Sequence, residues 1–177
     1  MIRGEVVSLR RFRAEDVDRV HAFAHEDVGG RSWWPGNPSR REVARRIGAS
    51  EVPGEQRLDL AIEVDGRLVG EVNARSPRDA FPEGVYEFGI AVYGDDRGRG
   101  YATEAVRLLL RHLFDELGAA RVQCSTDVEN VGMRTVAERA GLVGEGVLRG
   151  YMPAGRGRRD YVLYGITRSD WNGGTWT

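Results

Sequence analysis

Apolar and polar residues alternate in several short stretches of the chain, which is the pattern of half-buried β-strands. The alternation predicts strands at Val6–Arg11, Leu58–Val64, Leu68–Ala74, Val85–Val92, Arg121–Thr126, Val143–Arg149 and Tyr161–Ile166. Asp65-Gly66, between the second and third of these strands, favours a type I′ hairpin turn. The last two strands are expected to form another hairpin.

Between the strands, apolar residues recur at the three- and four-residue spacing of amphipathic helices. Segments with this spacing are 14–27, 39–47, 101–118 and 131–140. Ser39 and Glu42 have the spacing of a capping box, and Gly118 and Gly141 are typical of helix ends. The order β-α-α-β-β-β-α-β-α-β-β predicts a single α/β (α+β) domain over residues 1–177, in which helices cover the faces of a mixed sheet.

The amino-acid composition excludes several kinds of active and binding site. The 177 residues include 26 basic and 27 acidic side chains, so the net charge of −1 gives no overall attraction to nucleic acid. All the basic residues are arginine, which excludes a Walker-type phosphate loop and a lysine Schiff base. The single cysteine, Cys124, excludes internal disulfides and cysteine-cluster metal sites. Without a signal-like or membrane-spanning apolar stretch, we expect a cytoplasmic protein with no metal, membrane or nucleic-acid partner.

The segment VYEFGIAVYGDDRGRGYATEA combines a strand, a glycine-rich turn and a helix. A helix N-terminus carries unpaired N–H groups and the positive end of the helix dipole, so it attracts phosphate. Gly98 and Gly100 permit unusual dihedral angles and a close approach of the main chain to a ligand, and Arg97 and Arg99 add charged donors. The pattern predicts a pyrophosphate-binding turn, with an arginine-glycine surface loop as the alternative.

The run from Arg97 to Ala102 resembles the acyl-coenzyme-A signature Gln/Arg-x-x-Gly-x-Gly/Ala of the GNAT superfamily of N-acetyltransferases. Asn130 and VAERAGLVGEGVLRG are similar to segments of its RimJ/RimL-like branch, and the resemblance extends over nearly the whole chain. It implies a mixed, mostly antiparallel central sheet in which Val85–Val92 and Arg121–Thr126 splay apart, with flanking helices. It also implies acetyl-CoA as the co-substrate.

The same resemblance implies which residues bind the coenzyme. They are Val92, Arg97, Gly98, Arg99, Gly100, Tyr101, Ala102, Thr103 and Asn130. Main-chain amides of the turn would bind the pyrophosphate, and Val92 with its neighbours would hold pantetheine like an extra strand. A main-chain N–H near Val92 would polarise the thioester carbonyl. Asn130 would bond to the pantetheine arm, and it could also act as a helix N-cap.

Acetyl transfer requires an unprotonated amine, because an ammonium group has no lone pair and titrates near ~10. Glu87-Phe88-Gly89 matches the Glu-Ile/Phe/Leu-Gly strand of the RimJ/RimL-like branch, so Glu87 is the candidate general base, acting directly or through water. The alternative is a strand carboxylate paired with an arginine, and Glu71 is the substitute candidate.

The general acid is where this chain departs from the resemblance. Met133 and Ala137 stand where many relatives have a serine and a tyrosine, and neither side chain can donate a proton. Water, the substrate ammonium or Tyr151 could protonate the leaving thiolate, or no acid is needed.

The acceptor site is expected near Trp33 and Trp34, because the loop between the first two helices lines the acceptor pocket in the family. Paired aromatic rings suit a hydrophobic or cationic acceptor, and packing beneath the loop is the alternative. Tyr151 is the third candidate for acceptor binding. A basic turn at Arg156, Arg158 and Arg159 could meet the 3′-phosphate of the coenzyme, an acidic acceptor or only solvent.

The predicted function is transfer of an acetyl group from acetyl-CoA to a primary amine by direct attack in a ternary complex. The acceptor would be a protein or peptide N-terminus or a small-molecule amine, and a homodimer is an open option. A different class remains as the alternative: a catalytically silent acyl-CoA-binding sensor or partner-binding module.

Overall fold

The computed structural model describes residues 1–25, 38–48, 57–77 and 79–173. Within these ranges, eight strands form one sheet in the order β1-β2-β3-β4-β5-β6-β8-β7. The strands are β1 (Ile2–Arg3), β2 (Ser8–Arg10), β3 (Arg57–Val64), β4 (Arg67–Arg75), β5 (Val85–Val92), β6 (Arg121–Asp127), β7 (Val143–Ala154) and β8 (Gly157–Thr167). Among these described strands, only β5 and β6 pair in parallel, which confirms the mixed, mostly antiparallel sheet.

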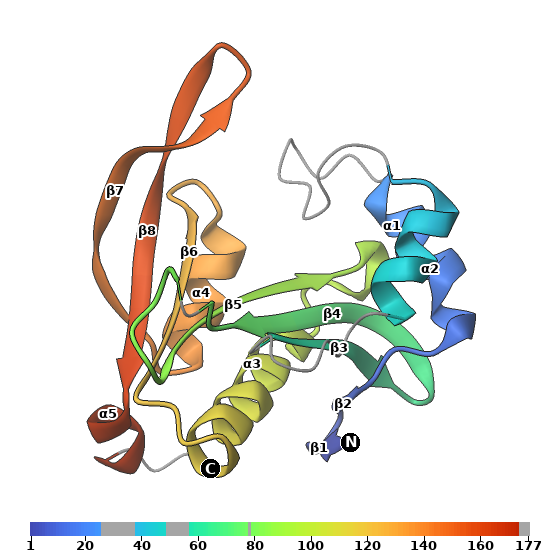
Figure 1. Ribbon diagram of the computed structural model, residues 1–177, viewed down its shortest axis with the longest axis horizontal. Coiled ribbons are helices and arrows are strands. Elements are labelled where there is room, and N and C mark those ends of the chain that lie inside the picture. The colour runs from blue at the N-terminus through green and yellow to red at the C-terminus, as the bar shows by residue number, and fades with distance from the viewer. Residues whose placement is uncertain (26–37, 49–56, 78, 174–177) are drawn as a thin grey trace.

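Helices cover both faces of the sheet. They are α1 (Val17–Ala24), α2 (Arg40–Gly48), α3 (Tyr101–Arg111), α4 (Val131–Arg139) and α5 (Arg168–Gly173). One hydrophobic cluster joins the sheet to α3 and α4, and a second joins its other face to α1 and α2. Figure 1 shows α1 and α2 above β3–β5 and α3 below them. The two faces are called the α3/α4 face and the α1/α2 face below.

The capping box and the hairpin turn predicted from neighbouring residues are both confirmed. The Ser39 amide donates to Glu42 Oε2 at 2.7 Å, and the Glu42 amide donates to Ser39 Oγ at 3.3 Å, so the capping box forms. Asp65 and Gly66 have φ angles of 49° and 76°, and a type I′ turn requires positive φ at both positions.

Arg10 and α5 both depart from what the sequence pattern predicts, and α3 ends at Arg111 instead of reaching Gly118. Arg10, a polar position of the first strand, is only 4% exposed. Its Nη1 lies 2.7 Å from Asp16 Oδ2 and its Nε contacts Glu63, so paired charge compensates its burial. At the other end of the chain, α5 was not predicted. Trp171 anchors it, because its ring stacks on Phe114 with centroids 5.3 Å apart.

The sheet opens between its two parallel strands. Pairing of β5 with β6 is confined to Val85–Arg121, Tyr86–Val122 and Glu87–Gln123. Beyond these pairs, β5 continues toward α1 and α2, while β6 runs toward the β7–β8 hairpin (Figure 1). The predicted splay of the two strands is confirmed, and it leaves an open edge along the second half of β5.

Candidate active site

Main-chain groups of β5 point into the opening between the strands. The Tyr93 amide donates to the Val69 carbonyl on β4 at 2.9 Å. Successive residues of a strand direct their main-chain groups to opposite sides, so Ile90 and Val92 direct theirs away from β4. The Val92 carbonyl accepts a hydrogen bond from Arg97 Nε at 2.8 Å, as expected for a group directed away from β4. The Val92 N–H therefore faces the gap, where an extended ligand could pair with it.

The N-terminus of α3 follows this open edge. Gly100 precedes the helix with φ +85°, and no side chain of the described residues caps it. The Glu104 amide donates to the Gly100 carbonyl at 3.2 Å, so the amides of Tyr101, Ala102 and Thr103 precede the first helical bond. Three such N–H groups at the positive end of a helix fit a diphosphate.

The glycines of the turn are required by backbone angle. Gly98 has φ +76° and Gly100 has φ +85°, and no described atom lies within 4 Å of where a Cβ would stand on either residue. An L-residue there would be strained without any clash. The open space in front of both glycines leaves room for a ligand.

The two arginines of the turn differ in their surroundings. The Arg97 amide donates to the Gly94 carbonyl at 3.3 Å and its Nε donates to Val92, so Arg97 helps to shape the turn. Arg99 is exposed and lines a pocket of about 560 Å³ together with Arg19, Phe23, Tyr93 and Asp96, among others.

Candidate bases lie on the α1/α2 face of the sheet. Glu71, Asn73 and Arg75 of β4 stand directly opposite Ala91, Gly89 and Glu87 of β5, respectively. Residues opposite each other share a face, and Ala91 packs against the α1–α2 cluster.

Glu87 and Glu71 have different partners on that face. The Glu87 side chain is 15% exposed, and its Oε2 lies 3.0 Å from Arg75 Nε. The arginine pairing named as an alternative for Glu87 is therefore present. Glu71 is 6% exposed and accepts a long hydrogen bond, 3.5 Å, from the Tyr93 hydroxyl. Burial, followed by the Glu71 charge, raises the pKa of Tyr93 far above its ordinary value.

The two carboxylates lie at different ends of the gap. Glu87 belongs to the last pair before the strands separate, whereas Glu71 stands opposite Ala91, next to Val92. Val92 lies five positions along the strand from Glu87, roughly 16 Å at about 3.3 Å per residue. A reacting carbonyl near Val92 would be closer to Glu71, and one deeper in the gap would be closer to Glu87.

Asn130 connects the end of β6 to α4. Its Oδ1 accepts from the Met133 amide at 3.2 Å, and its Nδ2 donates to Thr126 Oγ1 at 3.1 Å. The N-cap role is confirmed. Met133 is half-buried and Ala137 is fully buried. Neither side chain carries an N–H or O–H group, so α4 offers no proton donor at these two positions.

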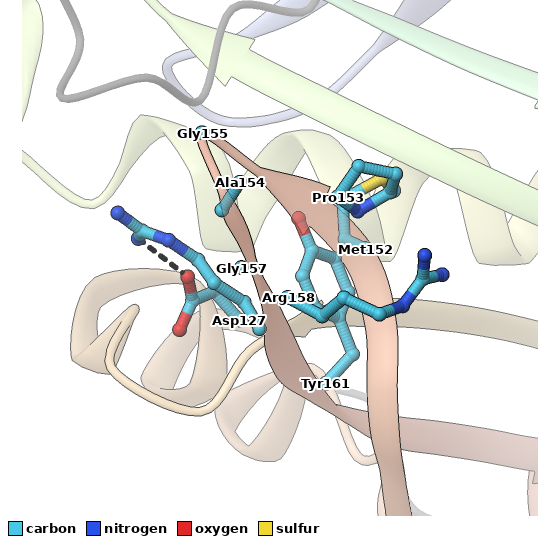
Figure 2. Close-up of a pocket in the computed structure, with 9 residues that line it drawn as sticks. Asp127, Met152, Pro153, Ala154, Gly155, Gly157, Arg158 and Tyr161 are labelled. Carbon is cyan, nitrogen blue, oxygen red and sulfur yellow. Dashed lines mark hydrogen bonds and ion pairs between the residues drawn. The ribbon is translucent and has the colours of Figure 1, made fainter.

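The β7–β8 hairpin lies on the far side of β6 from the gap, because β8 pairs with β6. A pocket of about 450 Å³ lies against it, lined by Asp127, Met152, Pro153, Ala154, Gly155, Gly157, Arg158, Arg159 and Tyr161. Figure 2 shows the Tyr161 ring beside Met152 and Pro153, and a dashed line at Asp127 that marks its ion pair with Arg159. Tyr151 is 46% exposed, and its ring centroid lies 5.5 Å from that of Tyr161. Sequence reasoning missed Tyr161 and Asp127, because only the pairing of β6 with β8 brings them together.

Two arginines of the basic turn at the hairpin tip bind other groups of the protein itself. Arg158 donates to the Tyr151 carbonyl at 2.8 Å and also contacts the Gly150 carbonyl. Arg159 Nη1 lies 2.8 Å from Asp127 Oδ2. Figure 1 places this tip and the N-terminus of α3 in different parts of the molecule. Trp33 and Trp34, the predicted acceptor contacts, lie outside the described residues.

The family described as "Acetyltransferase (GNAT) domain" matches residues 7–143. The chain belongs to the GNAT acetyltransferases. Acetyl-CoA is therefore its co-substrate, and the open edge of β5 and the free amides of α3 are the features that fit this ligand. Within the described ranges, no group of three or more His, Cys, Asp or Glu side chains could hold a metal ion, and no helix there is long and apolar enough to cross a membrane.

Relatives of this GNAT protein extend over nearly its whole length. YnaD of Bacillus subtilis, described as an uncharacterised N-acetyltransferase, is 29% identical over 93% of this chain and 95% of its own. Mycobacterium smegmatis RimJ in complex with CoA-disulfide is 25% identical, with a TM-score of 0.77 over 93% of this chain and 83% of that one. A GNAT-family acetyltransferase of Bacillus anthracis, 23% identical, has the same fold with a TM-score of 0.82 over 95% of this chain and 98% of its own. The RimJ structure agrees with the resemblance to the RimJ/RimL-like branch.

Proposed function

We propose that this GNAT protein transfers the acetyl group of acetyl-CoA to a primary amine, and that the amine attacks while both substrates are bound. The observation that carries the proposal is the gap beyond Glu87 and Gln123, whose β5 edge leads to the uncapped N-terminus of α3. The free edge of a strand can bind an extended pantetheine arm through main-chain hydrogen bonds, and the helix N-terminus can bind the diphosphate.

The chain's own residues would then perform three tasks. Amides of Tyr101, Ala102 and Thr103, together with the turn at Arg97–Gly100, bind the diphosphate. The Val92 N–H donates a hydrogen bond to the carbonyl oxygen, where negative charge develops during attack. Holding both substrates in attack geometry would supply much of the acceleration. Acetyl-CoA supplies an activated thioester carbonyl.

The amine approaches from the α1/α2 face. Both candidate bases, Glu87 and Glu71, project from this face, whereas the opposite face is filled by the hydrophobic core beneath α3 and α4. Glu87 is the proposed base, acting directly or through water, with Glu71 as the substitute. With the carbonyl held at Val92, roughly 16 Å along β5 from Glu87, Glu87 would receive the proton through water, whereas Glu71 lies nearer. The proton for the leaving thiolate would come from water, from the amine itself or from Tyr151, which is exposed.

The acceptor would be a protein N-terminus or a small-molecule amine. One relative, YdaF of Bacillus subtilis, is 24% identical over 96% of both chains and carries a provisional name as a ribosomal N-acetyltransferase. That name supports testing ribosomal-protein N-termini first. Tyr151, Trp33 and Trp34 stay candidate acceptor contacts.

Thiol release from acetyl-CoA tests the proposal with a panel of amines that includes N-terminal peptides of ribosomal proteins, polyamines and amino-sugar antibiotics. We expect turnover with at least one class of amine, and mass spectrometry should locate the acetyl group on nitrogen. Tight binding of acetyl-CoA without turnover on any amine would contradict the proposal and support a coenzyme-binding sensor, the reading that the family match favours less.

A further inference from the structure

Asp96 is a buried carboxylate in an exposed turn. It ends the 3₁₀ turn Gly94–Asp96, immediately before Arg97. Asp96 is 3% exposed, whereas its neighbours Asp95 and Arg97 are both exposed. Burying a carboxylate without compensation is costly, so its surroundings must hold it there.

Two arginines from distant parts of the chain compensate this carboxylate. Arg67 donates from Nη1 to Asp96 Oδ2 at 2.8 Å and from Nη2 to Oδ1 at 2.7 Å, a two-point pairing. Arg19 Nη2 donates to Oδ2 at 3.0 Å. The Arg67 hydrogen bond lowers the pKa of Asp96, so the carboxylate is ionised at neutral pH. We call Asp96, Arg19 and Arg67 the aspartate clasp.

The aspartate clasp joins two elements, α1 and β4, to the turn. Arg19 lies on α1, and Arg67 begins β4 after the hairpin turn. Asp96 precedes the turn Arg97–Gly100, which together with the first amides of α3 is called the cradle below. Arg19 is itself fixed, because its Nε donates to the Leu68 carbonyl at 2.8 Å and its guanidinium lies 5.8 Å from the centre of the Tyr93 ring. The turn is thus tied to both the α1/α2 face and the sheet.

A diphosphate site made of main-chain amides depends on this kind of anchor. Amides bind an anion well only when several of them point at one place, and ordering a loop on binding costs affinity. Gly98 and Gly100 make the turn flexible, so a fixed point two residues before Gly98 would reduce that cost. Two arginines around one carboxylate also leave net positive charge beside the ligand.

We propose that Asp96 is a positioning residue for coenzyme binding: through Arg67 and Arg19 it holds the turn so that the amides at the start of α3 converge on the diphosphate. The inference rests on the proposed placement of the diphosphate at this helix. Asp96 does not contact the coenzyme, and its effect passes through the backbone of residues 97–100.

Isothermal titration with CoA tests the role of Asp96. Asp96→Asn keeps the size of the side chain but removes its charge, and we expect its Kd for CoA to rise at least about tenfold. Asp95→Asn is the matched control, because it removes the same charge from the exposed neighbour, and its Kd should stay within about twofold of wild type. Circular dichroism melting of each protein without ligand reports whether the fold is retained.

A double-substitution experiment separates positioning from a general structural role. In the Gly98→Ala background, whose cradle is already distorted, Asp96→Asn should weaken CoA binding by much less than its effect in the wild type, because both changes act through one turn. Equal losses in both backgrounds, or wild-type affinity in folded Asp96→Asn, would overturn the proposal. If Asp96→Asn does not fold, Arg67→Lys, which keeps the charge but loses the two-point geometry, replaces it with the same expectations. If the wild-type protein bound no CoA, the placement of the diphosphate would fail instead.

Discussion

Glu87 and Gln123 form the last pair between β5 and β6 before the two strands separate. A carboxylate thus stands at the closed end of the gap, on the face from which the acceptor would arrive, and Arg75 Nε lies 3.0 Å from it. Glu71 stands near the other end, opposite Ala91. The position of the reacting carbonyl along β5 decides which of the two carboxylates can serve the amine.

Glu87→Gln should lower acetyl transfer by about a hundredfold at pH 7, within the usual contribution of a general base. The loss should shrink as the pH approaches ~10, because the free amine then exists without a base. Turnover measured from pH 6.5 to 10 checks this expectation. Glu83→Gln, an exposed carboxylate before β5, is the control. If Glu71→Gln shows this pH-dependent loss and Glu87→Gln does not, the base is Glu71.

Gly98→Ala should weaken CoA binding by at least about tenfold, since a residue with a Cβ resists φ near +76° and the turn must change shape. Gly118→Ala is the matched control. Gly118 has φ +71°, also has no described atom within 4 Å of a Cβ, and lies beyond the other end of α3. Each substitution should cost about 1–2 kcal/mol of stability, but only Gly98→Ala should change the Kd for CoA. Equal affinity in both variants would argue against the cradle.

Asn130 variants can separate its capping role from the proposed coenzyme contact. Asn130→Ala should lower the free energy of unfolding by about 1 kcal/mol through loss of the cap. Asn130→Asp still offers an oxygen to the Met133 amide but loses the amide donor that now bonds Thr126. We expect Asn130→Asp to retain stability and to bind CoA more weakly. Wild-type affinity in that variant would restrict Asn130 to its structural role.

Cys124 should be inert toward thiol reagents at pH 8. It is 1% exposed, and burial, followed by the Glu87 charge, raises its pKa from 9.0 to about 12. Because the thiolate is the reactive form, a chromogenic disulfide should label Cys124 only after denaturation. The raised pKa also means that Cys124 favours the folded state fully below pH 9 and that this contribution is lost as the pH rises toward 12. Rapid labelling of the native protein at pH 8 would contradict this account.

Signals carried by neighbouring residues predicted much of the fold. Ser39 and Glu42 predicted a cap, Asp65-Gly66 predicted its turn, and alternation placed β5 at its observed bounds. The splay of β5 from β6 came only from the family resemblance, because pairing between strands about 35 residues apart leaves no local pattern. The shape of the turn at Gly98 and Gly100 could be predicted in the same way, because both residues have the positive φ angles that glycine tolerates.

Contacts between residues far apart in the chain could not be predicted from the sequence. Arg10 looked like an outward strand position, and only the packing of Asp16 and Glu63 around it explains its burial. Asp96 had no feature to distinguish it from Asp95, because its partners are 29 and 77 residues away. Long-range ion pairs of this kind depend on the finished fold, and α5 likewise forms because Trp171 finds Phe114.

A crystal structure of the protein with acetyl-CoA is the most direct test of the account. It should place the diphosphate oxygens within hydrogen-bonding distance of the amides of Tyr101, Ala102 and Thr103, and the pantetheine arm along β5 with its carbonyl oxygen near the Val92 N–H. Coenzyme bound elsewhere, with the turn at Gly98–Gly100 free of ligand or the gap between β5 and β6 closed, would contradict it.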